Sequence, residues 1–82
     1  MYYANFLNWL LNERKLSQRG AKDVVSRCKR ICNMLGIENI DIATIDKLNR
    51  NTDFLKNSMF IKSQLRRALT LWIEFKGGSS NA

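Results

Sequence analysis

The chain contains no histidine, and this removes the most common general base together with the Ser–His and Cys–His nucleophile pairs. We therefore expect no catalysis by this chain alone and no cofactor. Cysteine is also scarce, with Cys28 and Cys32 as the two examples, whereas a metal site needs about four ligands. Because the two lie four residues apart on the apolar side of a predicted helix, we expect buried structural thiols.

Long apolar runs are missing as well. No stretch approaches the ~18 residues that a membrane-spanning helix needs, and the opening MYYANFLNWLLNERK has neither a basic leader nor a small-residue cleavage site. We expect a cytoplasmic protein with no membrane partner. At 82 residues the chain is long enough for one domain with one modest core. We assign that domain to residues 1–76, and residues 77–82 to a flexible linker or tail.

What the chain does contain is apolar residues at three- and four-residue spacing, which predicts helices. Four are expected, over residues 2–13, 18–35, from 41 into the forties, and from 57 or 58 to about 76. No strand pattern competes, so the fold class is an all-α bundle. The predicted inward residues are Tyr2, Tyr3, Phe6, Trp9 and Leu10; Ala21, Val24, Val25, Cys28, Ile31, Cys32 and Leu35; Ile42, Ile45 and Leu48; and Ile61, Leu65, Ala68, Leu69, Leu71, Trp72 and Phe75.

Helix boundaries are marked by residues that cap free backbone groups. Ser17 and Asp41 are predicted N-caps, and Gly36 is placed to end the second helix in a left-handed turn. Either Asn57 or Ser58 caps the last helix. The segment before it is expected to be a loop, with Phe54 and Leu55 turned back onto the core.

Charge is segregated along the chain. The net charge is +7, and the basic residues gather in residues 14–30 and 56–76, whereas the middle of the chain is acidic. Such segregation creates a field that attracts a polyanion, so nucleic acid is the first partner to consider. The alternative for any basic run is an ordinary solvated helix face.

The outward faces of the second and last helices carry the candidate contacts. Lys and Arg neutralise phosphates there, while Ser, Gln and Thr hydrogen-bond sugar, phosphate or base edges. We expect Arg19, Lys22, Lys62 and Arg66 to converge on one surface. The full predicted DNA-binding set is Lys15, Ser17, Gln18, Arg19, Lys22, Ser26, Lys29, Lys62, Ser63, Arg66, Arg67 and Thr70.

Four motifs follow one another along the chain: Phe6-Leu7-Asn8-Trp9-Leu10, Leu16-Ser17, Ile45-Asp46-Lys47-Leu48, and SQLRRALTLWIEF at residues 63–75. In this order they resemble the core-binding domain of tyrosine recombinases, the phage integrase family, over residues 4–76. The resemblance implies an orthogonal four-helix, SAM-like domain that forms one half of a clamp on double-stranded DNA. It also implies a C-terminal catalytic domain, which this sequence does not contain, and other recombinase protomers as further partners.

A protein-interaction module is the alternative. Leu7, Leu11, Met59 and Ile73 lie away from the main apolar stripes and are expected to be available to a partner subunit or to the catalytic domain. Binding to a membrane surface is less favoured, because the apolar faces of the helices match one another and are used by the core.

Overall fold

The computed structural model describes residues 3–77 and contains five helices and no strand in that range. The all-α fold class is thus confirmed, but the number of helices differs from the prediction. The additional helix is a single turn in the segment that the sequence predicts to be a loop. The helices are α1 (Tyr3–Asn12), α2 (Gln18–Leu35), α3 (Thr44–Arg50), α4 (Thr52–Leu55) and α5 (Met59–Lys76). Of the predicted tail at residues 77–82, Gly77 is the C-cap of α5, and residues 78–82 lie outside the described residues, as does the predicted start of the first helix at Tyr2.

The turn before α2 confirms the predicted capping. The Ser17 side-chain oxygen accepts a hydrogen bond from the Gly20 backbone N–H at 3.0 Å. At the other end, Gly36 takes a left-handed conformation with φ 66°, which a residue without a Cβ adopts at no steric cost. Both ends of α2 are therefore fixed by local hydrogen bonds and backbone conformation.

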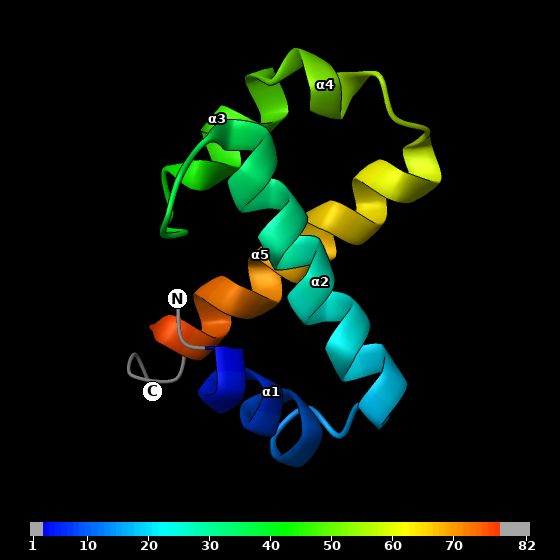
Figure 1. Ribbon diagram of the computed structural model, residues 1–82, viewed down its shortest axis with the longest axis vertical. Coiled ribbons are helices and arrows are strands. Elements are labelled where there is room, and N and C mark those ends of the chain that lie inside the picture. Colours follow the sequence, from blue (N-terminus) through cyan, green and yellow to red (C-terminus); the bar gives the residue numbers. More distant parts are fainter. Residues whose placement is uncertain (1–2, 78–82) are drawn as a thin grey trace.

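Helices α2 and α5 form the most extensive helix–helix contact, and α2 crosses in front of α5 in Figure 1. Helix α1 packs against both of them, and α3 with α4 closes the opposite end. The thiol of Cys28 donates to the Ala68 carbonyl oxygen at 3.5 Å and so links α2 to α5. Cys28 and Cys32 are both buried, as predicted.

Aromatic rings fill the space between α1 and the second half of α5. The rings of Phe6 and Trp72 meet edge to face with centroids 4.8 Å apart, and Phe75 lies 5.3 Å from Phe6. Trp9 packs beside them, 5.6 Å from Phe75, while remaining half-buried. The prediction that aromatic residues of the first helix face the core is thus confirmed for Phe6. Trp9 faces the same way but is only half-buried.

In the acidic segment around α3, the buried side chains are not all the ones that the sequence predicts. Leu48 is buried, but Ile42 is 75% exposed and Ile45 is 39% exposed. The buried position belongs instead to Thr44, whose hydroxyl accepts from the Asp41 backbone N–H at 3.0 Å and donates to the Asp41 carboxylate at 3.3 Å. Asp41 also accepts from the Thr44 backbone N–H at 3.2 Å. The N-cap position of α3 is nevertheless Ala43, which makes no side-chain cap, so the prediction of Asp41 as the N-cap is wrong. A polar residue can be buried here because its polar atoms are satisfied locally.

The connection between α4 and α5 settles which residue caps the last helix. The Ser58 hydroxyl accepts from the Ile61 backbone N–H at 3.3 Å, so Ser58 is the N-cap of α5. Asn57 instead donates from its side-chain amide to the carbonyl oxygens of Asp53 and Phe54 and closes α4. Phe54 is fully buried as predicted, whereas Leu55 is 48% exposed, contrary to the prediction.

Candidate nucleic-acid interface

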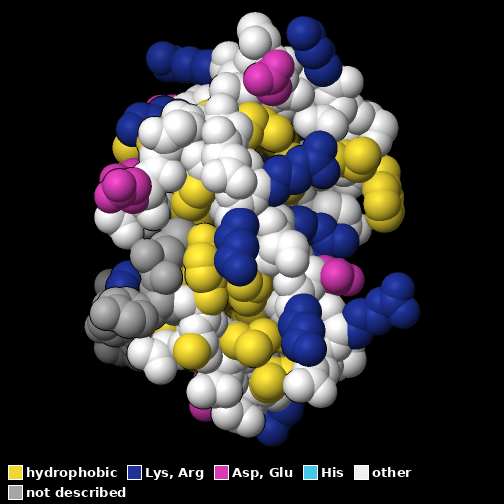
Figure 2. Space-filling model, viewed as in Figure 1, with side chains coloured by type: hydrophobic (Ala, Val, Ile, Leu, Met, Phe, Trp, Pro, Cys, Tyr) yellow, Lys and Arg dark blue, Asp and Glu magenta, His cyan; other side chains and the backbone are white. Residues whose placement is uncertain are grey.

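The outward side of α2 carries a continuous basic face. Arg19, Lys22, Ser26 and Lys29 are all exposed, and their three- and four-residue spacing places them along one side of the helix. Figure 2 shows Lys and Arg side chains gathered over α2, with hydrophobic side chains visible between them. We call Arg19, Lys22, Ser26 and Lys29 the α2 face.

The cations of the α2 face form no ion pair with an acid within residues 3–77, although the exposed Asp23 lies on the same helix. Within residues 3–77 the one ion pair joins Arg14 to Glu74, with Nη1 and Oε1 3.4 Å apart. The Lys29 ammonium contacts an aromatic ring, lying 4.9 Å from the centroid of Tyr3. Positive charge on this side of α2 therefore remains available to an outside anion.

The predicted contacts at the start of α2 are exposed as well. Lys15 has a left-handed backbone with φ 58°, and Gln18 is the first residue of the helix. The Ser17 oxygen is engaged by the Gly20 N–H, so the capping role of Ser17 is the one that the structure supports. These residues extend the α2 face toward the α1–α2 turn.

The predicted set on α5 is less uniform. Ser63, Arg67 and Thr70 are exposed, and Lys62 is half-buried. Arg66 is exposed but engaged, since its Nε donates to the Asn49 side-chain oxygen at 3.2 Å. Its guanidinium also lies over the Phe54 ring, with Cζ 5.0 Å from the centroid. Arg66 therefore ties α5 to α3 and α4.

The predicted contacts form two stripes, the α2 face and an α5 stripe made of Lys62, Ser63, Arg66, Arg67 and Thr70. Helices α2 and α5 cross, as Figure 1 shows, and each buries apolar residues in the core. On the outward side of α2, Arg30 donates to the Asn57 side-chain oxygen at 3.5 Å, just before α5 begins. The convergence of Arg19, Lys22, Lys62 and Arg66 on one surface stays a prediction.

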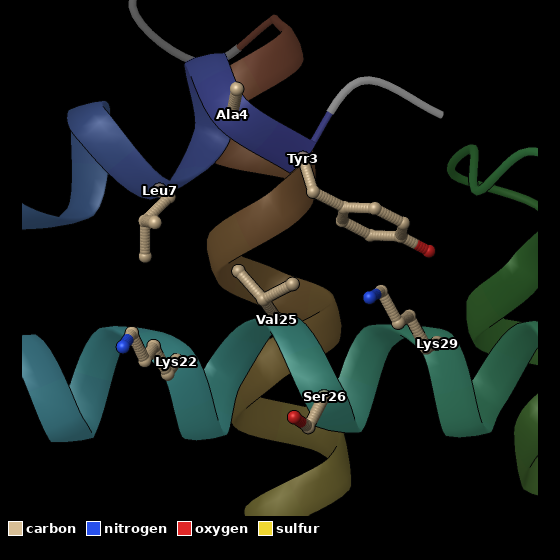
Figure 3. Close-up of a pocket in the computed structure, with 7 residues that line it drawn as sticks. All are labelled: Tyr3, Ala4, Leu7, Lys22, Val25, Ser26 and Lys29. Atoms are coloured by element: carbon tan, nitrogen blue, oxygen red, sulfur yellow. The ribbon is translucent and has the colours of Figure 1, made fainter.

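A pocket lies beside the α2 face, between α1 and α2, with a volume of about 350 Å³. Its lining combines an apolar floor with three polar side chains that were predicted to contact DNA. Figure 3 shows Val25 on α2 between the two lysines, with Leu7 and Tyr3 approaching from α1. The lining residues are Tyr3, Ala4, Leu7, Lys22, Val25, Ser26 and Lys29.

Tyr3 is the site residue that the sequence did not reveal. The helical spacing places it on the core stripe of α1, but it is half-buried and forms a wall of this pocket. Burial raises the pKa of its hydroxyl above the ordinary value, and Cys32 and Cys28 add to the effect. The phenol is protonated at neutral pH, as any tyrosine of ordinary pKa is, and its hydroxyl forms a hydrogen bond with Cys32.

Two further features bear on the chemistry of the surface. Residues 3–77 contain no group of three or more Cys, Asp or Glu side chains placed to hold a metal ion. None of the helices in that range combines the length and apolar character needed to cross a bilayer.

Comparison with known proteins identifies no similar sequence or structure. The chain matches no protein-family model, no curated protein sequence and no solved structure. The resemblance to tyrosine recombinases therefore depends on the four sequence motifs alone.

Proposed function

We propose that this chain is a non-catalytic module that binds double-stranded DNA through the α2 face. The observation that carries the proposal is the row of exposed side chains Arg19, Lys22, Ser26 and Lys29, whose cations have no acidic partner within residues 3–77. Phosphates attract such a row because binding releases condensed counterions. The resemblance of the motifs extends the proposal to a SAM-like core-binding domain of a tyrosine recombinase, whose catalytic domain would be a separate unit.

The α2 face is suited to position a duplex more than to read its sequence. Lysine ammonium groups act as point charges on phosphates, and a serine hydroxyl adds a hydrogen bond to sugar or phosphate. Arg19 is the residue of the face that has the geometry to contact a guanine edge with two hydrogen bonds. We therefore expect that the affinity for DNA falls steeply as the salt concentration rises and depends only modestly on DNA sequence.

Charge reversal on the α2 face tests the proposal. The double variant Arg19→Glu/Lys22→Glu should weaken binding to a fluorescent 20-base-pair duplex by tenfold or more (an order-of-magnitude expectation), as measured by anisotropy. The matched control Lys47→Glu/Arg50→Glu makes the same change in net charge on α3. It should bind the duplex far more tightly than the α2 variant does. A third variant, Lys62→Glu/Arg67→Glu, measures the contribution of the α5 stripe.

The outcomes separate the surfaces. If the α2 variant binds like the wild type while the α5 variant fails, the assignment to α2 is wrong. If all three variants lose affinity equally, the attraction is a property of net charge and no face is assigned. Circular dichroism of each variant confirms that the helices are retained.

An exposed apolar patch favours protein docking as a second candidate function. Met59 is 74% exposed and Phe60 is 70% exposed at the start of α5, and Leu55, the last residue of α4, is 48% exposed. Leu7, Leu11 and Ile73, which the sequence also suggested for docking, instead pack partly buried against the core. Large exposed apolar side chains in one place are typical of contacts with another protein.

Sedimentation at low and high salt tests the docking function. Self-association that persists at high salt and disappears in the Phe60→Ser variant would support it, since apolar contacts are not screened. Binding of that variant to the duplex should be unchanged. A wild-type chain that stays monomeric at both salt concentrations would remove self-docking as a function.

A further inference from the structure

The pocket between α1 and α2 has the composition of a small-ligand site. Its volume of about 350 Å³ lies within the range of roughly 300–1,000 Å³ that ligand pockets occupy. Ala4, Leu7 and Val25 supply apolar surface, and the Tyr3 ring adds a flat wall. Such a lining favours the apolar body of a ligand.

The polar groups of the pocket share one sign of charge. Lys22 and Lys29 lie on either side of Val25, and no acidic residue is among the lining residues. The Lys29 ammonium is placed at the rim by its contact with the Tyr3 ring, 4.9 Å from the centroid. Ser26 adds a hydroxyl, whereas the Tyr3 hydroxyl is hydrogen-bonded to Cys32 and Tyr3 contributes its ring.

We propose that this pocket binds a small amphipathic anion, with the apolar body against Leu7 and Val25 and the anionic head between Lys22 and Lys29. A carboxylate, sulfonate or phosphate meets the same need, since each accepts charge-assisted hydrogen bonds from ammonium groups. The apolar floor requires a body as well as a head. An inorganic anion alone fills only part of the site.

Binding in this pocket has a consequence for the DNA surface. Lys22 and Lys29 belong both to the pocket and to the α2 face, so one bound anion neutralises cations that a duplex needs. Where the proposed DNA function holds, the ligand and the duplex compete. Ligand binding itself does not rest on that function and is measured without DNA.

Titration of the full 82-residue chain with octanoate, followed through backbone amide NMR shifts, tests the site directly. We expect saturable shifts at Ala4, Leu7 and Ser26. Octanol keeps the apolar body without the charge, and acetate keeps the charge without the body. Both should bind about tenfold more weakly or worse, because each lacks one half of the contacts.

Two variants localise the binding. Lys22→Gln/Lys29→Gln should weaken octanoate about tenfold and leave octanol unchanged, whereas the matched variant Lys47→Gln/Lys56→Gln should behave like the wild type. Ala4→Leu places a larger side chain at the pocket wall and should block both ligands. The amide spectrum of each variant without ligand reports whether the fold is intact.

Contrary results are equally clear. The anion site would be wrong if octanol bound as tightly as octanoate. It would also be wrong if the amide shifts were centred on Met59 and Phe60. So would full octanoate affinity in Lys22→Gln/Lys29→Gln. A chain that binds octanoate as expected but not duplex DNA would keep the pocket and remove the DNA function.

Discussion

The guanidinium of Arg66 lies over the ring of Phe54, with Cζ 5.0 Å from the ring centroid. Phe54 is fully buried in the one-turn helix α4, and Arg66 is an exposed residue in the middle of α5. The Arg66 Nε also donates to the Asn49 side chain in α3. One side chain thus covers the short α4 turn and joins it to two other helices, which gives Arg66 a structural role.

Replacing Arg66 should therefore lower the stability of the fold. Arg66→Ala removes a cation–π contact and a hydrogen bond, and we expect a loss of about 1 kcal/mol in the free energy of unfolding. Arg67→Ala removes the same charge from an exposed position with no such contact and should cost less than about 0.5 kcal/mol. Thermal unfolding followed by circular dichroism compares them, and equal melting temperatures would contradict the structural role.

The serine caps of the two long helices give a second prediction. Ser17→Ala and Ser58→Ala each leave a backbone N–H without its side-chain acceptor, and each should cost about 1 kcal/mol. Ser63→Ala is the control, because Ser63 is exposed within α5 and alanine is the better helix former there. Urea unfolding measures all three. A loss at Ser63 as large as at the caps would count against this explanation.

The sequence predicts buried residues well where the apolar spacing of a helix continues over several turns. In the 18-residue helix α2 the spacing from Ala21 through Val24, Val25 and Cys28 to Cys32 continues one apolar side, and these residues are buried. The segment at Ile42 and Ile45 is too short for a pattern to override local chemistry. There the hydrogen bonds between Asp41 and Thr44 turn the threonine inward and leave the isoleucines exposed.

The candidate site was predictable in part for a related reason. A helical wheel places Lys22, Ser26 and Lys29 on the outward side of α2, and the structure exposes them. The pocket was not predictable, because it arises only where α1 packs beside α2 and brings Tyr3 to Lys29. The contacts of Arg66 with Asn49 and Phe54 likewise depend on how α3 and α4 pack against α5, which spacing within one helix does not encode.

The buried thiol of Cys28 leads to a prediction about alkaline pH. Burial raises the pKa of Cys28 from its ordinary 9.0 to about 12, and Cys32 adds to the effect. The stabilisation is complete below pH 9, where both states hold the proton. It is lost as the pH rises toward 12, because the unfolded chain gives up a proton that the folded chain retains.

Urea unfolding in reducing buffer at pH 7, 9 and 10.5 measures this effect. The free energy of unfolding should fall above pH 9, and it should fall less steeply in Cys28→Ala, which lacks the thiol. Some dependence should remain in that variant, because burial also raises the pKa values of Cys32 and Tyr3. Identical slopes for the variant and the wild type would exclude Cys28 as a source.

The indole of Trp72 connects α5 to the segment before α3. Its Nε1–H donates to the Ile40 carbonyl oxygen at 3.3 Å, and both residues are buried. Trp72→Phe keeps an aromatic ring but leaves that carbonyl without its donor and opens a small cavity, so we expect a loss of about 2–4 kcal/mol. Trp9→Phe is the matched control. Trp9 is half-buried, so a loss of about 1 kcal/mol is expected there. Urea unfolding at neutral pH measures the free energy of unfolding of both variants. If the indole holds this segment in place, the backbone amides of Ile40 and Asp41 should exchange faster in Trp72→Phe and not in Trp9→Phe.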